Sequence, residues 1–318
     1  MITEVIPLGT ASAMPTRERH LSSTAVVCGG SMVLFDCGEG TQFRMMQAGL
    51  KRPRIDAVFI THLHGDHYFG LMGLLSTLAL LKRTAPLTLV GPAGLEALLQ
   101  KLPGVRADEL TFSIEHVALW DDLVHAVVFE TEDFTVEARP VEHRVFTVGY
   151  RFQEKTRPGR LDVDRARALG VTEYRHYRAL KAGEAVTLDD GSVVLPEAVV
   201  GPPRPGQAFA YITDTRPCEA AVTLARDAAL LYHEATFGDD LPERAAETGH
   251  STARQAAEIA RRAGAARLLL GHFSARYKDV SGLVEEARSV FQNTEAAEEL
   301  KRYNFFRGPG KISWGGKI

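Results

Sequence analysis

The six residues from His62 to His67 include three histidines and one aspartate. His62 and His64 are two residues apart, so in an extended chain their side chains point to the same side. Gly65 permits a tight turn, after which Asp66 and His67 can fold back over the same space. Imidazole nitrogens and carboxylate oxygens are suitable ligands for zinc or manganese. The segment therefore predicts a metal site, and its alternating ligands suit two ions a few ångströms apart.

This His-x-His-x-Asp-His pattern, with the preceding segment 35–42 (FDCGEGTQ), resembles the metallo-β-lactamase superfamily. In that family a first metal takes the two histidines of His-x-His and a later lone histidine. A second metal takes the Asp-His pair and a C-terminal histidine, and an aspartate bridges the two. The resemblance implies two Zn²⁺ ions per subunit, with Mn²⁺ or another divalent ion as the alternative. The implied ligands are His62, His64, Asp66, His67, His143, Asp214 and His272.

Apolar and β-branched runs elsewhere predict the strands that position these residues. The expected strands are 3–8, 24–28, 32–36, 57–61, 87–90, 110–117, 124–130, 134–140, 208–213, 230–233 and 267–270. Helical patterns cover 39–46, 71–81, 93–99, 252–263 and 283–291. A β-rich stretch followed by strand–helix alternation occurs twice, which favours two similar halves. We therefore expect an α/β metallo-β-lactamase fold, a four-layer αβ/βα sandwich in which His143, Asp214 and His272 follow predicted strands and are held rigidly.

The segment 151–205 has many turn residues and charges and few long apolar runs. We expect a single domain, 1–318, that carries this segment as an inserted arm. From residue 151 to residue 184 there are nine basic and five acidic residues, so this stretch has a net charge of +4 while the remainder has −7. Local basic enrichment favours phosphate binding; a solvated charged loop is the alternative. Tyr174 and Tyr177 are expected either to stack on bases or to pack internally.

Two short segments narrow the family further. Residues 233–237 (HEATF) end a predicted strand, and residues 249–252 (GHST) open the next predicted helix. Together with the metal pattern and the insert they resemble ribonuclease Z, the endonuclease that removes the 3′ trailer from precursor tRNA. The resemblance covers about residues 2–299. It implies an arm that binds tRNA, a homodimer, and a catalytic pair beside the metals formed by Glu234 and His250.

The implied reaction has a physical basis. Two metals about 3.5–4 Å apart can generate hydroxide near neutral pH and hold both the attacking and the leaving oxygen of a phosphodiester. Asp66 is the candidate proton acceptor for the attacking water. His250, held protonated by Glu234, is the candidate donor to the leaving 3′-oxygen, which becomes the 3′-hydroxyl of the tRNA. Ser251 and Thr252 begin the helix and are expected to cap it or to meet phosphate.

Basic residues in two segments are candidates for RNA contact. Residues 49–54 (GLKRPR) resemble a family loop that senses the tRNA 3′ end, and we expect them near the metals. The family loop usually has proline before lysine or arginine, whereas here Lys51 and Arg52 precede Pro53. Residues 301–318 lie beyond the resemblance and receive no prediction. The predicted RNA-binding residues are Lys51, Arg52, Arg54, Arg157, Arg160, Arg175, Arg178 and Lys181.

Composition limits the remaining classes. The 318 residues include 37 Lys and Arg against 40 Asp and Glu, a net charge of −3, so any nucleic-acid surface is local. Hydrophobic residues make up 45%, as in soluble globular proteins, and no run reaches the roughly 18 apolar residues of a membrane span. Cys28, Cys37 and Cys218 lack Cys-x-x-Cys spacing and are expected to be free thiols in a reducing cytoplasm.

Two enzymatic alternatives remain open, because this fold carries many activities. One is a phosphodiesterase or other metallohydrolase for small molecules, which would have no use for a long basic insert. The other is a 3′-exonuclease acting on RNA with the same site. A non-catalytic RNA-binding scaffold is disfavoured, since no ligand of the implied set is missing.

Overall fold

The computed structural model describes residues 3–106 and 108–304. Its contacts divide the chain into two compact units. The larger unit contains the residues up to 131, 135–152, and those from 208 onward; the smaller unit contains 132–134 and 153–207. No helix in the described ranges is both long enough and apolar enough to cross a membrane.

The first sheet of the larger unit has seven strands in the order β16-β1-β2-β3-β4-β5-β6. Its strands are β1 (Thr3–Gly9), β2 (Ser23–Cys28), β3 (Ser31–Phe35), β4 (Ile55–Phe59), β5 (Leu87–Pro92), β6 (Ile114–Leu119) and β16 (Tyr303–Asn304). The pairs from β16 to β3 are antiparallel, whereas β3 to β6 are parallel. The intervening helices are α1 (Thr41–Gln47), η1 (Arg52–Arg54), α2 (Gly65–Tyr68), α3 (Gly70–Leu80) and α4 (Leu95–Leu99).

The second sheet also has seven strands, in the order β15-β14-β13-β12-β9-β8-β7. Its strands are β7 (Ala126–Glu130), β8 (Phe134–Val141), β9 (Thr147–Glu154), β12 (Ala208–Ile212), β13 (Leu230–Glu234), β14 (Leu268–Gly271) and β15 (Thr294–Ala296). From β12 to β15 the strands are parallel, so their carboxyl ends meet at one edge. Its helices are α8 (Glu219–Ala225), α9 (Pro242–Thr248), α10 (Ala253–Ala263) and α11 (Ser281–Arg288).

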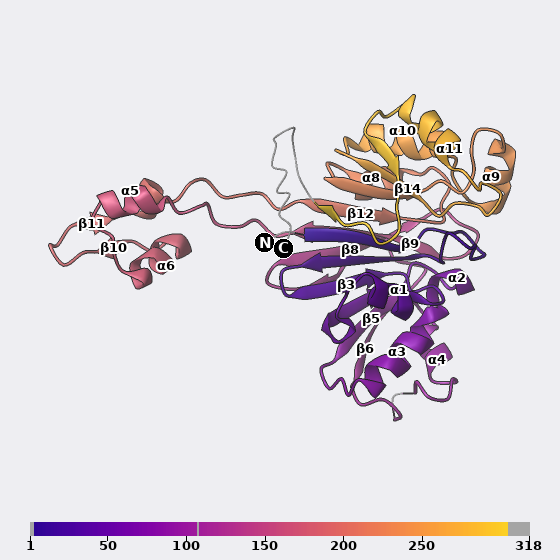
Figure 1. The fold of residues 1–318 in the computed structure, drawn as a ribbon, viewed down its shortest axis with the longest axis horizontal. Helices are drawn as coiled ribbons and strands as arrows, with labels where there is room; N and C mark the ends of the chain where they lie inside the picture. The colour runs from indigo at the N-terminus through magenta and orange to yellow at the C-terminus, as the bar shows by residue number, and fades with distance from the viewer. Residues whose placement is uncertain (1–2, 107, 305–318) are drawn as a thin grey trace. The chain divides into compact units, whose positions relative to one another are not determined.

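The two sheets pack against each other through buried aromatic rings. The ring of Phe35 on β3 lies 5.2 Å from that of Phe59 on β4 and 5.5 Å from that of Tyr211 on β12. Separate apolar clusters join each sheet to its own helices, such as the α3 leucines Leu71 and Leu78 under the first sheet. Figure 1 shows the helices on the outer faces of the paired sheets. The predicted four-layer sandwich is confirmed.

The smaller unit has a core of its own. It contains α5 (Val163–Ala168), α6 (Tyr174–Ala182), β10 (Val186–Thr187), β11 (Val193–Val194) and α7 (Pro196–Val199). Ala166, Val171, Leu180, Val186, Val194 and Val199 are buried together. The sequence predicted only turns and charges here, because single apolar residues spaced along short elements leave no long apolar run.

Candidate metal centre

The first two candidate ligands follow the end of β4. His62 is fully buried, and its Nε2 atom lies 2.9 Å from Nδ1 of His64. His64 keeps extended backbone angles, as expected for side chains that share one side. The Nδ1 atom of His62 is 3.0 Å from the hydroxyl of Thr61, which orients the ring.

The turn at Gly65 begins α2, which presents Asp66 and His67. The His67 amide donates to the carbonyl of His64, so the chain folds back within one turn. A Cβ atom on Gly65 would lie 2.3 Å from the ring of Phe69. A larger residue at this position would therefore displace the ring of Phe69, whereas the turn itself does not require glycine, because Gly65 is not among the glycines with a left-handed backbone.

Asp214 lies between the other ligands at the end of β12. Its Oδ1 atom is 3.3 Å from Nε2 of His67 and 3.1 Å from Nε2 of His272. Its Oδ2 atom is 3.6 Å from Nε2 of His62 and 3.8 Å from Nε2 of His143. One carboxylate thus faces two sets of histidines, each with a different oxygen.

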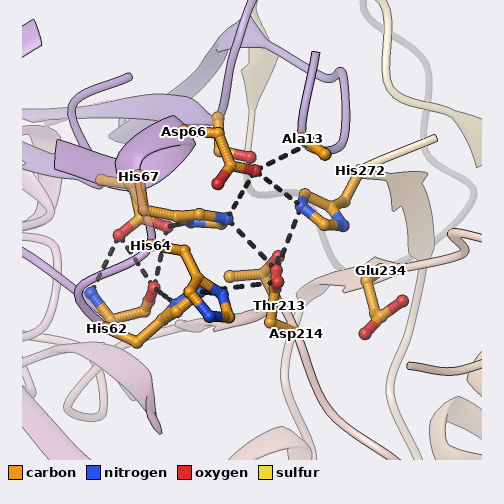
Figure 2. Close-up of polar contacts among 12 residues, drawn as sticks. Ala13, His62, His64, Asp66, His67, Thr213, Asp214, Glu234 and His272 are labelled. Atoms are coloured by element: carbon orange, nitrogen blue, oxygen red, sulfur yellow. Dashed lines mark hydrogen bonds and ion pairs between the residues drawn. The ribbon is translucent and has the colours of Figure 1, made fainter. Parts of the chain in front are cut away.

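Asp66 completes the second set, as Figure 2 shows. Its Oδ2 atom is 3.3 Å from Nε2 of His67 and 3.7 Å from Nε2 of His272. The amide of Ala13 donates to the same oxygen at 2.8 Å and holds the carboxylate in place. All seven predicted ligands therefore converge on one place. They fall into the groups His62, His64, His143 and Asp214, and Asp66, His67 and His272.

The donor atoms fit a metal and lack another partner. In the described residues, Nε2 of His67, His143 and His272 is buried without any hydrogen bond. Two ligands about 2.0–2.1 Å from a tetrahedral ion lie about 3.4 Å apart, and the ligand atoms here are 2.9–3.8 Å apart. The residues present therefore fit divalent ions in both groups.

The outer nitrogen of each of these rings is fixed by an oxygen atom. Nδ1 of His143 donates to the carbonyl of Gly249 at 2.7 Å, and Nδ1 of His272 lies 2.9 Å from the hydroxyl of Thr236. Such contacts set the tautomer and the direction of a ligating histidine.

Asp36 does the same for His67, and sequence reasoning gave it no role. Its buried carboxylate is 2.8 Å from Nδ1 of His67 and also accepts from the Thr61 amide and the Tyr211 hydroxyl. The available signal was a carboxylate at the end of a predicted strand inside the quoted segment 35–42.

The electrostatics favour a cation at this place. Burial alone would lower the pKa of His67, but the carboxylates of Asp214, Asp36 and Asp66 raise it well above its usual value. Burial also lowers the pKa of His62, which keeps that imidazole neutral as metal binding requires. Three carboxylates in a buried cluster thus carry negative charge that bound cations would balance.

Three residues of the centre have left-handed backbone angles. The φ angles of Asp36, Asp214 and His272 are 58°, 47° and 55°. Asp36 and His272 directly follow β3 and β14, and Asp214 is two residues after the end of β12. In each case this conformation turns the side chain out of the strand direction and into the site.

A buried acid–histidine pair lies beside the ligands. The Oε1 atom of Glu234, at the end of β13, is 2.9 Å from Nδ1 of His250, and the Thr215 amide also donates to it. Burial lowers the pKa of His250, but the charge and the hydrogen bond of Glu234 raise it to about 9. His250, His272 and Asp214 have ligand-type atoms within 4.8 Å of one another. The predicted pair is therefore assembled at the metal centre.

The two hydroxyls after His250 have structural roles. Thr252 caps α10 by accepting from the amide of Gln255, as expected. Ser251 is buried and donates to the carbonyl of Thr215 at 2.6 Å. Ser251 is thus committed to the fold and is not presented to phosphate.

The predicted RNA-binding residues of the larger unit lie away from the ligands. Lys51, Arg52 and Arg54 are at η1, before β4, whereas His62 follows β4. Eight residues of extended chain span about 25 Å. The expectation that this basic segment lies near the metals of its own chain is therefore wrong, because the segment lies at one end of β4 and the ligands lie at the other.

The predicted RNA-binding residues of the smaller unit divide into two sets. Arg160, Arg178 and Lys181 line a cavity of about 810 Å³ together with Tyr174.

 Tyr174 is 77% exposed, whereas the hydroxyl of Tyr177 donates to the carbonyl of Val171 and packs internally.

Two of these cations are already paired. Arg157 lies 3.6 Å from the carboxylate of Glu154, and Arg175 forms an exposed ion pair with Glu173. The cavity residues are thus better placed for phosphate than Arg157 and Arg175.

The fold and the site together define a protein of the metallo-β-lactamase class. Residues 192–273 match the family model described as a beta-lactamase superfamily domain, and residues 3–156 match that of the anti-Pycsar protein Apyc1. The metallo-β-lactamase fold protein YhfI from Bacillus subtilis has the same fold, with a TM-score of 0.66 at 19% identity over 95% of this chain and 99% of that chain.

Closer relatives identify the family. The chain is 56% identical to ribonuclease Z of Salinibacter ruber over 304 residues, which cover 95% of this chain and 94% of that protein. It is 46% identical to ribonuclease Z of Myxococcus xanthus, over 90% of this chain and 92% of the relative. The crystal structure of the short form of human tRNase Z matches with a TM-score of 0.66 at 28% identity, over 95% of this chain and 99% of that one. The chain belongs to the ribonuclease Z family.

Proposed function

We propose that this protein is a metal-dependent endoribonuclease that removes the 3′ trailer from precursor tRNA. It hydrolyses one phosphodiester bond and leaves a 3′-hydroxyl on the tRNA. The observation that carries the proposal is the cluster of two ligand groups around Asp214 with the Glu234–His250 pair beside it. Membership of the ribonuclease Z family, which includes the human tRNase Z neighbour, supports tRNA as the substrate.

Seven residues would hold two divalent ions. His62, His64 and His143 would hold one, Asp66, His67 and His272 the other, and Asp214 would contact both. Five imidazoles among the ligands favour zinc over magnesium or calcium. Bound there, the ions would supply Lewis-acid activation of the phosphodiester and of the attacking water.

The chain's own groups then move the protons. The Asp66 carboxylate, whose Oδ2 is held by the Ala13 amide, accepts the proton of the attacking water. Glu234 occupies Nδ1 of His250, so the Nε2–H of the imidazolium remains to protonate the leaving 3′-oxygen. Because Glu234 is buried and fixed by the amide of Thr215, it keeps the ring of His250 in this direction.

The smaller unit supplies the RNA contacts that a small-molecule enzyme would not need. Arg160, Arg178, Lys181 and Arg204 line its cavity with the exposed Tyr174. Guanidinium and ammonium groups neutralise phosphates, and an exposed aromatic ring can stack on a base. In this proposal residues 1–318 form a single domain, and the inserted residues 151–205 are its tRNA-binding arm.

We include a homodimer in the cytoplasm in this proposal. Phe43 and Met46 on α1 are 60% and 57% exposed, and Phe69 at the start of α3 is 52% exposed. Exposed apolar side chains on neighbouring helices are typical of a surface that a second copy covers. The three cysteines are free and buried, in keeping with a reducing compartment.

The test incubates purified protein with a precursor tRNA bearing a 3′ trailer, with and without a chelator, and maps the product ends. A single chelator-sensitive cut that leaves a 3′-hydroxyl on the tRNA supports the proposal. A ladder of shortened trailers would assign a 3′-exonuclease instead. Hydrolysis of a small phosphodiester without cleavage of RNA would assign a small-molecule phosphodiesterase.

A matched pair of variants tests the arm. Replacing residues 153–207 by a short glycine linker should abolish cleavage of precursor tRNA, because it removes the basic cavity of the smaller unit. The Arg160→Gln and Arg178→Gln double variant should reduce cleavage in the same direction with the fold of the unit intact. Arg175→Gln, which removes a cation already paired with Glu173, is the control.

A further inference from the structure

A second basic cavity lies beside the metal centre in the larger unit. It has a volume of about 560 Å³ and is lined by Arg144, Arg244, Arg276 and His250, among others. None of the seven proposed metal ligands lines it, and no carboxylate does. His250 is therefore the point at which this cavity adjoins the catalytic groups.

Two of its three arginines are free to bind an anion. In the described part of the chain, no carboxylate forms an ion pair with Arg144 or Arg276, whereas Arg244 lies 3.3 Å from Glu247. Both unpaired arginines are exposed. Guanidinium groups bind phosphate through two parallel hydrogen bonds, so the chemistry of this cavity selects a phosphate group.

Neighbouring groups hold these two arginines in place. The guanidinium of Arg276 lies over the ring of Phe237, 5.8 Å from its centroid, and the same ring is 6.1 Å from that of His250. The stem of Arg144, one residue after a proposed metal ligand, packs near Gly249, the residue before His250. The cavity and the proton donor are thus built from the same short segments.

We propose that Arg144 and Arg276 bind the phosphate on the 5′ side of the discriminator nucleotide, one phosphate before the bond that is cleaved. This inference rests on the proposed function. Since His250 protonates the leaving 3′-oxygen, the nucleotide that carries this oxygen lies on the His250 side of the site. Its 5′ phosphate is then the next phosphate available to a cavity that adjoins His250 but contains no metal ligand.

The test asks whether removing the arginine and removing the charge of the phosphate affect the same interaction. Precursor tRNA is made with one uncharged methylphosphonate linkage at the phosphate 5′ of the discriminator, and kcat/KM is measured for wild type and Arg276→Gln. Loss of a charged hydrogen bond lowers kcat/KM about 10-fold or more. We expect each change alone to have this effect, mainly through KM, and both together to cost little more than one. Arg276→Lys should restore part of the loss, and Arg144→Gln should show the same coupling.

Three results would overturn the inference. One is that the losses of kcat/KM from Arg276→Gln and from the methylphosphonate multiply when the two changes are combined. Another is that Arg276→Gln is coupled instead to a methylphosphonate placed on the trailer side of the cut. The third is a wild-type enzyme insensitive to the discriminator linkage. The control is Arg261→Gln on α10, an exposed residue paired with Glu258, which should behave as wild type. Failure of wild type to cleave unmodified precursor tRNA would refute the proposed function itself, and this inference with it.

Discussion

Replacing Asp36 by asparagine should weaken metal binding without removing a ligand. The Oδ1 atom of Asp36 accepts from the Thr61 amide, so the oxygen of the new side chain must stay on that side. Its NH₂ group then replaces Oδ2, which lies 2.8 Å from Nδ1 of His67. Because an NH₂ group donates, His67 has to accept at Nδ1 and carry its proton on Nε2, the atom that faces Asp214. The ligand nitrogen is thereby blocked.

The size of the effect follows from the role of such contacts. Loss of the group that orients a ligating histidine lowers metal affinity about 10–100-fold, which corresponds to about 1.4–2.7 kcal/mol. The assay is zinc binding to metal-free protein in competition with a chromophoric chelator. Asp56→Asn is the matched control, because Asp56 accepts from the Met32 amide elsewhere in the first sheet.

The outcome depends on the folded state of both variants. Thermal unfolding of the metal-free proteins shows whether Asp36→Asn is folded at the assay temperature. If the folded variant binds two zinc ions as tightly as wild type, Asp36 does not set the tautomer of His67.

Three further predictions concern the proton donor, the turn and the ions. Glu234→Gln should lower kcat about 100-fold. Because Glu234 holds the pKa of His250 at about 9, the activity of the variant should begin to fall at a lower pH than that of wild type as the pH is raised. An unchanged pH–rate profile would contradict this prediction. Gly65→Ala should displace the ring of Phe69. Because this ring is 52% exposed and can move, the free energy of unfolding should change by less than about 1 kcal/mol, while the shift of the adjoining Asp66 and His67 should lower the metal content measured by elemental analysis. Removing the ions with a chelator should lower the melting temperature, since ligand at 100 times Kd stabilises the native state by about 2.7 kcal/mol; equal melting temperatures with and without zinc would refute a centre in the folded chain.

The metal ligands were predictable because their signal is local. His62, His64, Asp66 and His67 are close in sequence, and His143, Asp214 and His272 each follow a strand whose apolar run is readable. The two-sheet architecture follows from the same runs and their order. Local spacing alone predicted the first four ligands, whereas the last three were implied by the family resemblance and were then located at the ends of predicted strands.

The contributions that were missed depend on contacts between distant segments. Asp36 reaches His67 and Tyr211, which only the packed sheets bring together. Arg276 became a candidate through its place over Phe237. The basic segment at residues 49–54 was misplaced because it was judged by its charge, although it precedes β4 and His62 follows that strand. A sequence pattern does not state such distances.

At Asp36, Asp214 and His272, which have left-handed backbone angles, the metal centre requires a side chain whereas the stability of the fold favours glycine. A non-glycine residue in this conformation costs roughly 1–2 kcal/mol, and glycine would adopt it without that cost. Selection for stability alone would therefore favour glycine at these three places. Their side chains persist only under selection for what the centre does, so a lineage that lost the activity should lose these residues early and become more stable as it did so.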